Sequence, residues 1–69
     1  MRKRMVVLGA AESGVGAAVL AQKKGFDVFV SDMGKIKPHY VEMLDRYGLV
    51  WEEGGHTEEL ILNADEVVK

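Results

Sequence analysis

The sequence predicts an α/β fold in which helices cover both faces of a parallel sheet. Four short apolar segments alternate with three segments of helical pattern, in the order β-α-β-α-β-α-β. Strands that alternate with helices are joined by right-handed crossovers, which make neighbouring strands parallel. The apolar run over residues 5–8 is continuous, as expected for a strand that is covered on both faces. The length of 69 residues allows one small domain at most.

The composition narrows the class of protein and its partners. Nine Lys and Arg against eleven Asp and Glu give a net charge of −2, and 48% of the residues are hydrophobic, which favours a globular domain over a disordered one. There is no cysteine, so disulfides and zinc–thiolate sites are excluded. The mixed charge argues against nucleic acid or an anionic membrane as the main partner. No apolar run approaches the roughly 20 residues that span a bilayer, so we expect a soluble cytoplasmic domain.

The first half of the chain is expected to form a strand, a helix and a second strand. Residues 5–8 form the first strand and end at a glycine. A helix is expected over residues 14–24, where small and apolar residues recur at helical spacing, and Gly25 provides its left-handed end. The second strand covers residues 28–30 and closes at Ser31–Asp32. Residues 33–37 are then expected to form a loop.

The second half repeats this pattern on a shorter scale. Pro38 suits the first turn of a helix because its missing N–H would have no partner there, and Gly48 is expected to end that helix. Thr57 is a plausible N-cap for a brief helix. The other expected elements are a strand over residues 49–51, a turn over 52–55, a helix through residue 62 and a strand that opens at 66–68. The chain stops within or just after that strand, so we expect a truncated domain of a longer protein.

The glycine-rich turn between the first strand and the first helix carries the functional signal. Residues 9–14 match the Rossmann-like pattern G-x-G-x-x-G at Gly9 and Gly14, with Ala11 at the second glycine position. Gly9 allows the tight turn, and Gly14 allows close packing of the helix on the sheet. The backbone N–H groups at the start of the helix point toward an anion along the helix dipole. The fold class is therefore a Rossmann-like open parallel sheet.

An acidic residue lies where such folds hold a ribose or a base. Asp32 ends the second strand, 18 residues after Gly14. Together with the turn it predicts a nucleotide-type site. The alternative is that the glycines serve only a tight turn and that Asp32 is a solvated strand end. Glu12 is expected to point to solvent, because its charge would oppose a diphosphate.

The sequence as a whole resembles the N-terminal domain of the UDP-N-acetylmuramoyl-L-alanine–D-glutamate ligases, the MurD members of the Mur ligase family. The resemblance covers essentially all 69 residues. It rests on Val6–Gly9, Glu12–Gly16, Asp32, the turn at Gly54, and Ala64–Lys69, which matches the segment before the Ser-Pro-Gly turn of that family. Two residues depart from the pattern. Ala11 replaces a frequent second glycine, and Gly34 stands where some members place a side chain that can contact uracil.

The resemblance implies that residues 1–69 bind the UDP end of UDP-N-acetylmuramoyl-L-alanine. In the full-length ligase of peptidoglycan synthesis, and so of cell-wall biogenesis, cell shape and cell division, later domains would supply the remaining functions. A central domain would bind ATP and magnesium, and a C-terminal domain would bind D-glutamate. The implied substrate-binding residues are Ala11, Glu12, Ser13 and Gly14 at the diphosphate, and Asp32, Met33 and Gly34 at the uracil and ribose. No catalytic residue and no metal ligand is implied here, and the 69-residue fragment alone is expected to be inactive and to bind no cofactor.

Two other interpretations stay open at this point. An NAD- or FAD-binding Rossmann domain of an oxidoreductase or a regulatory sensor would use the same turn and the same acid, although Ala11 in place of glycine weakens it. The second interpretation is that the chain is a fragment of an α/β domain that binds no ligand of its own. A metal site is not expected, because His39 and His56 are predicted on different loops with no third ligand nearby.

Overall fold

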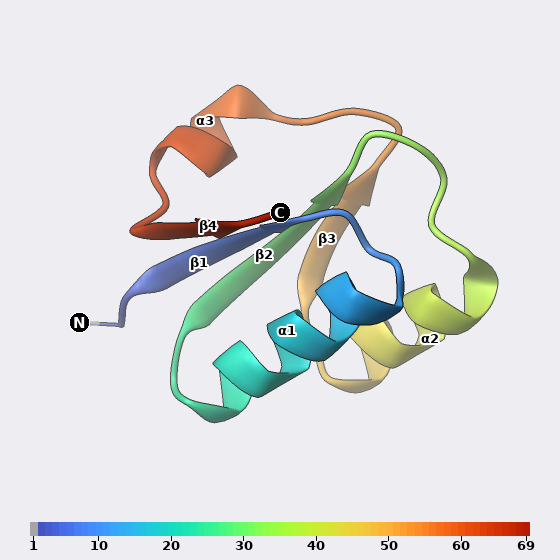
Figure 1. Ribbon diagram of the computed structural model, residues 1–69, viewed down its shortest axis with the longest axis horizontal. Coiled ribbons are helices and arrows are strands. Elements are labelled where there is room, and N and C mark those ends of the chain that lie inside the picture. The colour runs from blue at the N-terminus through green and yellow to red at the C-terminus, as the bar shows by residue number, and fades with distance from the viewer. Residues whose placement is uncertain (1) are drawn as a thin grey trace.

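The structure, a computed structural model that describes residues 2–69, contains one four-stranded parallel sheet. The strands are β1 (Arg4–Leu8), β2 (Asp27–Asp32), β3 (Val50–Glu53) and β4 (Glu66–Val68). The helices that connect them are α1 (Glu12–Lys23), α2 (Pro38–Arg46) and α3 (Glu58–Leu62). The strand order is β3-β2-β1-β4, and every neighbouring pair is parallel (Figure 1). The predicted Rossmann-like α/β fold is confirmed.

The structure differs from the prediction at the start of α1, which begins at Glu12 instead of residue 14, at the end of β3, and in the place of His39. Glu52 and Glu53 belong to β3 instead of a turn, because they pair with Ser31 and Asp32 of β2. The edge strand tolerates them because each carboxylate accepts a hydrogen bond, Glu52 from the Ser31 hydroxyl and Glu53 from the Ile36 amide. His39 also does not lie on a loop, because α2 begins one residue before it, at Pro38.

The face of the sheet that carries α1 and α2 holds the main apolar core. Val7 of β1 and Val30 of β2 are fully buried against Val15 and Ala18 of α1 and Leu44 of α2. The small residues along α1 let the helix lie close to the strands. This packing fixes the position of the start of α1 relative to the end of β1.

The opposite face is covered far less. Val6 and Phe29 are buried on it, because side chains alternate between the two faces along β1 and β2. The helix that covers this face is α3, which has only five residues and no buried side chain (Figure 1). Val50 and Val67 on the two edge strands remain exposed.

The carboxyl ends of the strands bring the glycine turn and two loops to one edge of the sheet. The chain steps from β1 to β2 and β3 on one side, and then returns to place β4 on the other side of β1. The order of the strands therefore reverses at β1, and open α/β sheets bind ligands at the carboxyl edge at such a point. Within residues 2–69, no helix combines the length and the apolar character that a membrane crossing requires.

Candidate functional site at the carboxyl edge of the sheet

The glycine turn is held in shape by two close approaches of the backbone. Gly9 has a φ of 101°, a left-handed conformation that side chains strain, and its amide donates to the Ser31 carbonyl at 2.8 Å. A Cβ atom on Gly14 would lie 1.8 Å from the Gly9 carbonyl oxygen. Both predicted roles, the tight turn at Gly9 and the close packing at Gly14, are therefore visible in the geometry.

The first turn of α1 presents backbone donors that no side chain caps. Ala11 occupies the N-cap position, where its methyl group accepts no hydrogen bond. The first intrahelical bond runs from the Val15 amide to the Ala11 carbonyl at 2.9 Å, so the amides of residues 12–14 precede the helical ladder. These N–H groups lie at the positive end of a twelve-residue helix. The arrangement suits an anion such as a phosphate.

Asp32 is bound to the backbone on both sides of the site. Its Oδ2 accepts the Ala10 amide at 2.7 Å, and its Oδ1 accepts the Gly34 amide at 2.9 Å. These two hydrogen bonds, the Ala10 bond first, lower the pKa of the Asp32 carboxyl, so it is a carboxylate at neutral pH. Each oxygen keeps further acceptor capacity, which a donor of a ligand can use.

A hollow of about 490 Å³ opens beyond the end of β2. It is lined by Met33, Gly34, Lys35, Glu53 and Gly54. Two backbone hydrogen bonds join the loops on its two sides. The Gly54 amide donates to the Gly34 carbonyl at 2.9 Å, and the Gly55 amide donates to the Asp32 carbonyl at 3.3 Å. The Met33 side chain is 64% exposed at its rim. The loops after β2 and β3 therefore form one unit.

The structure brings some of the predicted residues together and separates others. Asp32 contacts the glycine turn directly through Ala10, and Met33 and Gly34 line one hollow. Glu12 is exposed, as expected, and lines a different groove with His39, Tyr40 and Met43 between α1 and α2. Ala11, Ser13 and Gly14 line neither the hollow at Met33 nor the groove at Glu12. The site therefore has two halves, the start of α1 and the loop after β2, joined by Asp32.

Sequence reasoning missed two sets of residues near this site. Lys35 supplies a cation to the hollow, and its position three residues after Asp32 was the only signal for it. A polar cluster of Ser31, Glu52, His56 and Thr57 lies directly behind the end of β2. Its signal was the pair of glycines before His56, which lets the loop turn back toward the sheet.

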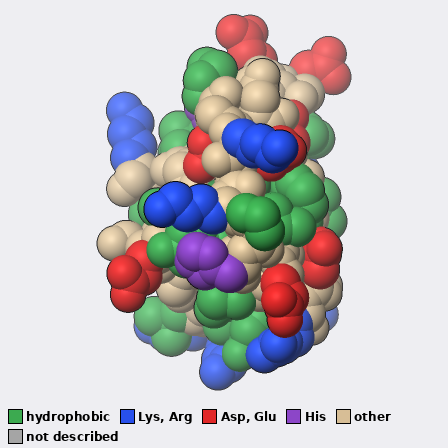
Figure 2. All heavy atoms as spheres, turned by 90° about the vertical axis from the view of Figure 1, so that its right-hand side faces the viewer, with side chains coloured by type: hydrophobic (Ala, Val, Ile, Leu, Met, Phe, Trp, Pro, Cys, Tyr) green, Lys and Arg blue, Asp and Glu red, His purple; other side chains and the backbone are tan. Residues whose placement is uncertain are grey.

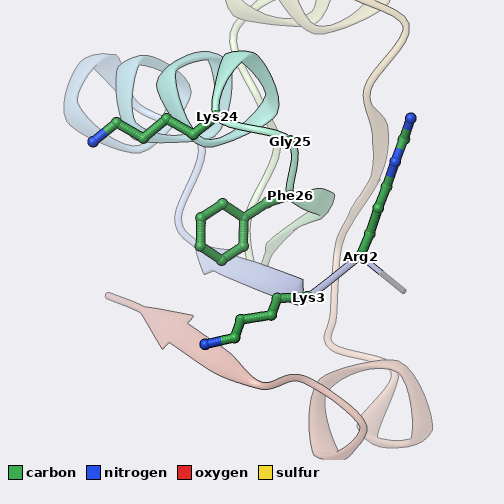
Figure 3. A pocket seen from close by; sticks show the side chains of 5 residues that line it. All are labelled: Arg2, Lys3, Lys24, Gly25 and Phe26. Carbon is green, nitrogen blue, oxygen red and sulfur yellow. The ribbon is translucent and has the colours of Figure 1, made fainter.

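Charge alone does not define a site elsewhere on the molecule. A hollow of about 280 Å³ at the opposite, amino edge of the sheet is lined by Arg2, Lys3, Lys24, Gly25 and Phe26. Figure 3 shows the three cationic side chains diverging around the Phe26 ring instead of pointing at a common centre. The face in Figure 2, by contrast, mixes acidic, basic and hydrophobic side chains without a broad patch of one charge.

The comparisons with known proteins show the family of the chain. The family model of the MurD N-terminal domain matches residues 4–68. The chain belongs to this family. Two relatives are the UDP-N-acetylmuramoylalanine–D-glutamate ligases of Bacteroides thetaiotaomicron, 67% identical over 67 residues, and of Christiangramia forsetii, 52% identical over 69 residues. These alignments cover 97% and 100% of this chain but 15% and 16% of the relatives, so the chain spans about a sixth of the length of these MurD ligases.

A solved structure shares the MurD-type fold of this chain but carries another name. The bacillithiol disulfide reductase Bdr (YpdA) from Bacillus cereus superposes with a TM-score of 0.62 and 32% sequence identity. The match covers 81% of this chain and 20% of that protein. The fold of most of this chain is thus shared with a part of a disulfide reductase, whereas the family model matches nearly the whole chain.

Proposed function

We propose that residues 1–69 form the domain that binds the UDP end of UDP-N-acetylmuramoyl-L-alanine in an ATP-dependent UDP-N-acetylmuramoylalanine–D-glutamate ligase. The observation that carries the proposal is the uncapped first turn of α1 beside the anchored Asp32 carboxylate. A nucleoside diphosphate needs donors for its phosphates and an acceptor for its ribose or base. The start of α1 offers the donors for the phosphates, and Asp32 offers the acceptor for the ribose or base.

The diphosphate would lie against the start of α1. The amides of residues 12–14 donate toward it along the helix dipole, and the exposed Ser13 adds a hydroxyl. Ala11 carries a methyl group where a second glycine would let a phosphate touch the backbone, so the phosphate sits slightly further out. Glu12 lines the groove on the α2 side, which leaves the diphosphate side to the amides. Lys35 contributes a positive charge in the adjoining hollow after β2.

The uracil and ribose would occupy the hollow after β2. Asp32 offers its remaining acceptor sites to an N–H or O–H group of the ligand. Met33 gives an apolar wall for one face of the base, and Gly34 keeps the backbone open to it. This half of the proposal explains why an aspartate, a flexible apolar side chain and a glycine follow one another in the sequence.

Under this proposal, this domain binds the substrate and the rest of a longer protein carries out the ligation. Ligation would activate the alanyl carboxylate of the substrate as an acyl phosphate, which the amine of D-glutamate attacks to form an amide. The residues of this chain do not fit ATP or magnesium. Gly34–Lys35 lacks the first glycine of a P-loop and is followed by Ile36 instead of Ser or Thr, and nowhere in residues 2–69 do three His, Cys, Asp or Glu side chains come together as metal ligands. Following the family resemblance, we assign ATP, magnesium and D-glutamate to the central and C-terminal domains of the longer protein.

A binding titration tests the proposal against a dinucleotide site. UDP-N-acetylmuramoyl-L-alanine, UDP and NAD are each titrated into the protein that carries this chain, by calorimetry and by backbone amide NMR. We expect both UDP compounds to bind and to shift the amides of residues 9–14 and Asp32. Binding of NAD at these amides, with no response to either UDP compound, would contradict the proposal and favour the oxidoreductase type of site.

A further inference from the structure

A buried serine lies at the centre of a polar network behind the proposed substrate site. The Ser31 side chain is 0% exposed, and its hydroxyl lies 2.8 Å from Glu52 Oε2 and 2.5 Å from His56 Nδ1. Glu52 also accepts the Thr57 amide at 2.8 Å and the Thr57 hydroxyl at 2.6 Å. The network therefore joins the ends of β2 and β3 to the loop that leads into α3.

The number of protons in the network determines whether His56 Nδ1 donates or accepts its hydrogen bond with Ser31. The hydrogen bonds from Thr57, its hydroxyl first, lower the pKa of the Glu52 carboxyl, so Glu52 is an ion that only accepts. The Ser31 hydroxyl has one proton, and the Glu52 carboxylate at 2.8 Å is a nearer and stronger acceptor for it than the Gly55 carbonyl at 3.4 Å. A hydrogen bond between Ser31 Oγ and His56 Nδ1 then requires that Nδ1 carry a proton and donate it. Neutral His56 is thereby restricted to the tautomer with a bare Nε2.

The same serine supports both halves of the proposed substrate site through its backbone. The Ser31 carbonyl accepts the Gly9 amide at 2.8 Å, and the next residue is Asp32, whose own carbonyl accepts the Gly55 amide. A shift of Ser31 would therefore move the glycine turn and the Asp32 carboxylate together. The loop on the other side of the contact, residues 54–57, also forms part of the hollow through Gly54.

We propose that His56 is a positioning residue for the substrate site, which it acts on by donating from Nδ1 to the buried Ser31 hydroxyl and so holding the end of β2 in register with the loop after β3. His56 itself does not touch the ligand. This inference rests on the proposed function, because the property that it predicts is affinity for the UDP end of the substrate.

The test compares side chains that replace one imidazole nitrogen at a time. The amide nitrogen of asparagine can take the place of Nδ1, whereas that of glutamine reaches the place of Nε2. In the full-length protein that carries this chain, we expect His56→Asn to keep the KM for UDP-N-acetylmuramoyl-L-alanine within about threefold of the parent value. His56→Gln and His56→Ala should each raise the KM about tenfold with kcat nearly unchanged, since a buried group left unpaired weakens binding by roughly that factor. His39→Ala, at the other histidine of the chain, is the matched control and should leave both constants unchanged.

A second measurement separates this inference from the proposed function. Long-range proton–nitrogen NMR of the histidine-labelled protein, assigned with His56→Asn, shows which ring nitrogen carries the proton. We expect Nδ1–H, and a proton on Nε2 alone would overturn the inference even if UDP compounds bind well. Rescue by His56→Gln, or an unchanged KM in His56→Ala with only a lower Tm, would also overturn it. Failure of the parent protein to bind UDP compounds, with Nδ1–H present, would instead contradict the proposed function and the positioning role that depends on it.

Discussion

The two edges of the sheet both offer positive charge, but they offer it in different ways. At the amino edge, Arg2, Lys3 and Lys24 bring three cations around a hollow, and their side chains diverge (Figure 3). At the carboxyl edge, the charged side chains include Asp32 and Glu53, yet the amides of α1 point in one fixed direction. Fixed backbone dipoles lose no conformational freedom when a ligand binds, whereas long cationic side chains must be ordered first. Preorganised donors, more than net charge, therefore distinguish the proposed site at the carboxyl edge from the hollow at the amino edge.

The largest effect is expected when the fixed geometry of the carboxyl edge is broken. Gly14→Ala places a methyl group 1.8 Å from the Gly9 carbonyl oxygen, so the start of α1 must move away from the sheet. We expect a loss of about 3 kcal/mol or more in the free energy of unfolding, as for a severe overpacking change. Chemical denaturation of the two proteins measures this difference.

A second glycine on the same helix provides the control for that prediction. A Cβ atom on Gly16 meets nothing within 4 Å, so Gly16→Ala should stabilise the protein by about 0.5–1 kcal/mol through helix propensity alone. Equal effects of the two substitutions would show that helix α1 is not held against the glycine turn as described.

The next largest effect is expected on the pH dependence of stability, through the carboxylates that hold the end of β2 and the loop after β3. Hydrogen bonds lower the pKa of both Asp32 and Glu52 in the folded protein. Their contribution to stability is therefore present above the ordinary carboxyl pKa and is lost as the pH falls through the lower folded-state pKa. Glu52→Gln should reduce the free energy of unfolding at pH 7 by about 1–2 kcal/mol and flatten its dependence on pH below about 5.

Denaturation at several pH values measures this dependence. Glu59→Gln, at an exposed glutamate in the first turn of α3, is the control and should leave the slope unchanged. If Glu52→Gln and the parent protein lose stability in parallel on acidification, Glu52 does not take part in the network as assigned.

The smallest effects are expected when one lysine is removed from either edge of the sheet. Lys35→Ala removes a cation from the hollow at the carboxyl edge and should raise the KM for the UDP substrate about threefold, as for one solvated charge near a diphosphate. Lys24→Ala removes a cation from the amino edge and should change the KM by less than about 1.5-fold, because salt screens exposed charges beyond about 8 Å. The reverse order in steady-state kinetics would place the anion at the amino edge.

The sequence predicted the parts of this molecule that depend on local rules. The order of the elements, the turn at Gly9 and the close packing at Gly14 all follow from short-range patterns, and the structure confirms them. It did not predict that Glu52 lies in β3, because acidic residues are rare in strands and only the partners of this one make the position favourable. Thr57 likewise precedes α3 as predicted but donates its hydroxyl to Glu52 instead of capping the helix.

The hydrogen bonds by which Asp32 connects the two halves of the site could not be predicted from the sequence either. Asp32 was recognised from its spacing to Gly14, but its hydrogen bonds to Ala10 and Gly34 depend on how β1 and β2 align in the sheet. The same holds for the contact of Ser31 with His56, which are 25 residues apart. Long-range contacts of single side chains leave no periodic pattern, so the sequence predicted a ligand site at this edge of the sheet but not the hydrogen bonds that support it.

The most direct test of the central claim is a kinetic comparison of two aspartates at opposite ends of β2. In the full-length protein, Asp32→Ala removes the proposed acceptor at the carboxyl edge, and Asp27→Ala removes an exposed acid at the amino edge. The contact with the UDP end is remote from the reacting carboxylate and is equal in ground and transition states, so Asp32→Ala should raise the KM roughly tenfold with kcat within about twofold. Asp27→Ala should change neither constant. An unchanged KM in Asp32→Ala, in a protein that remains folded, would contradict the assignment of the carboxyl edge as the UDP-binding site.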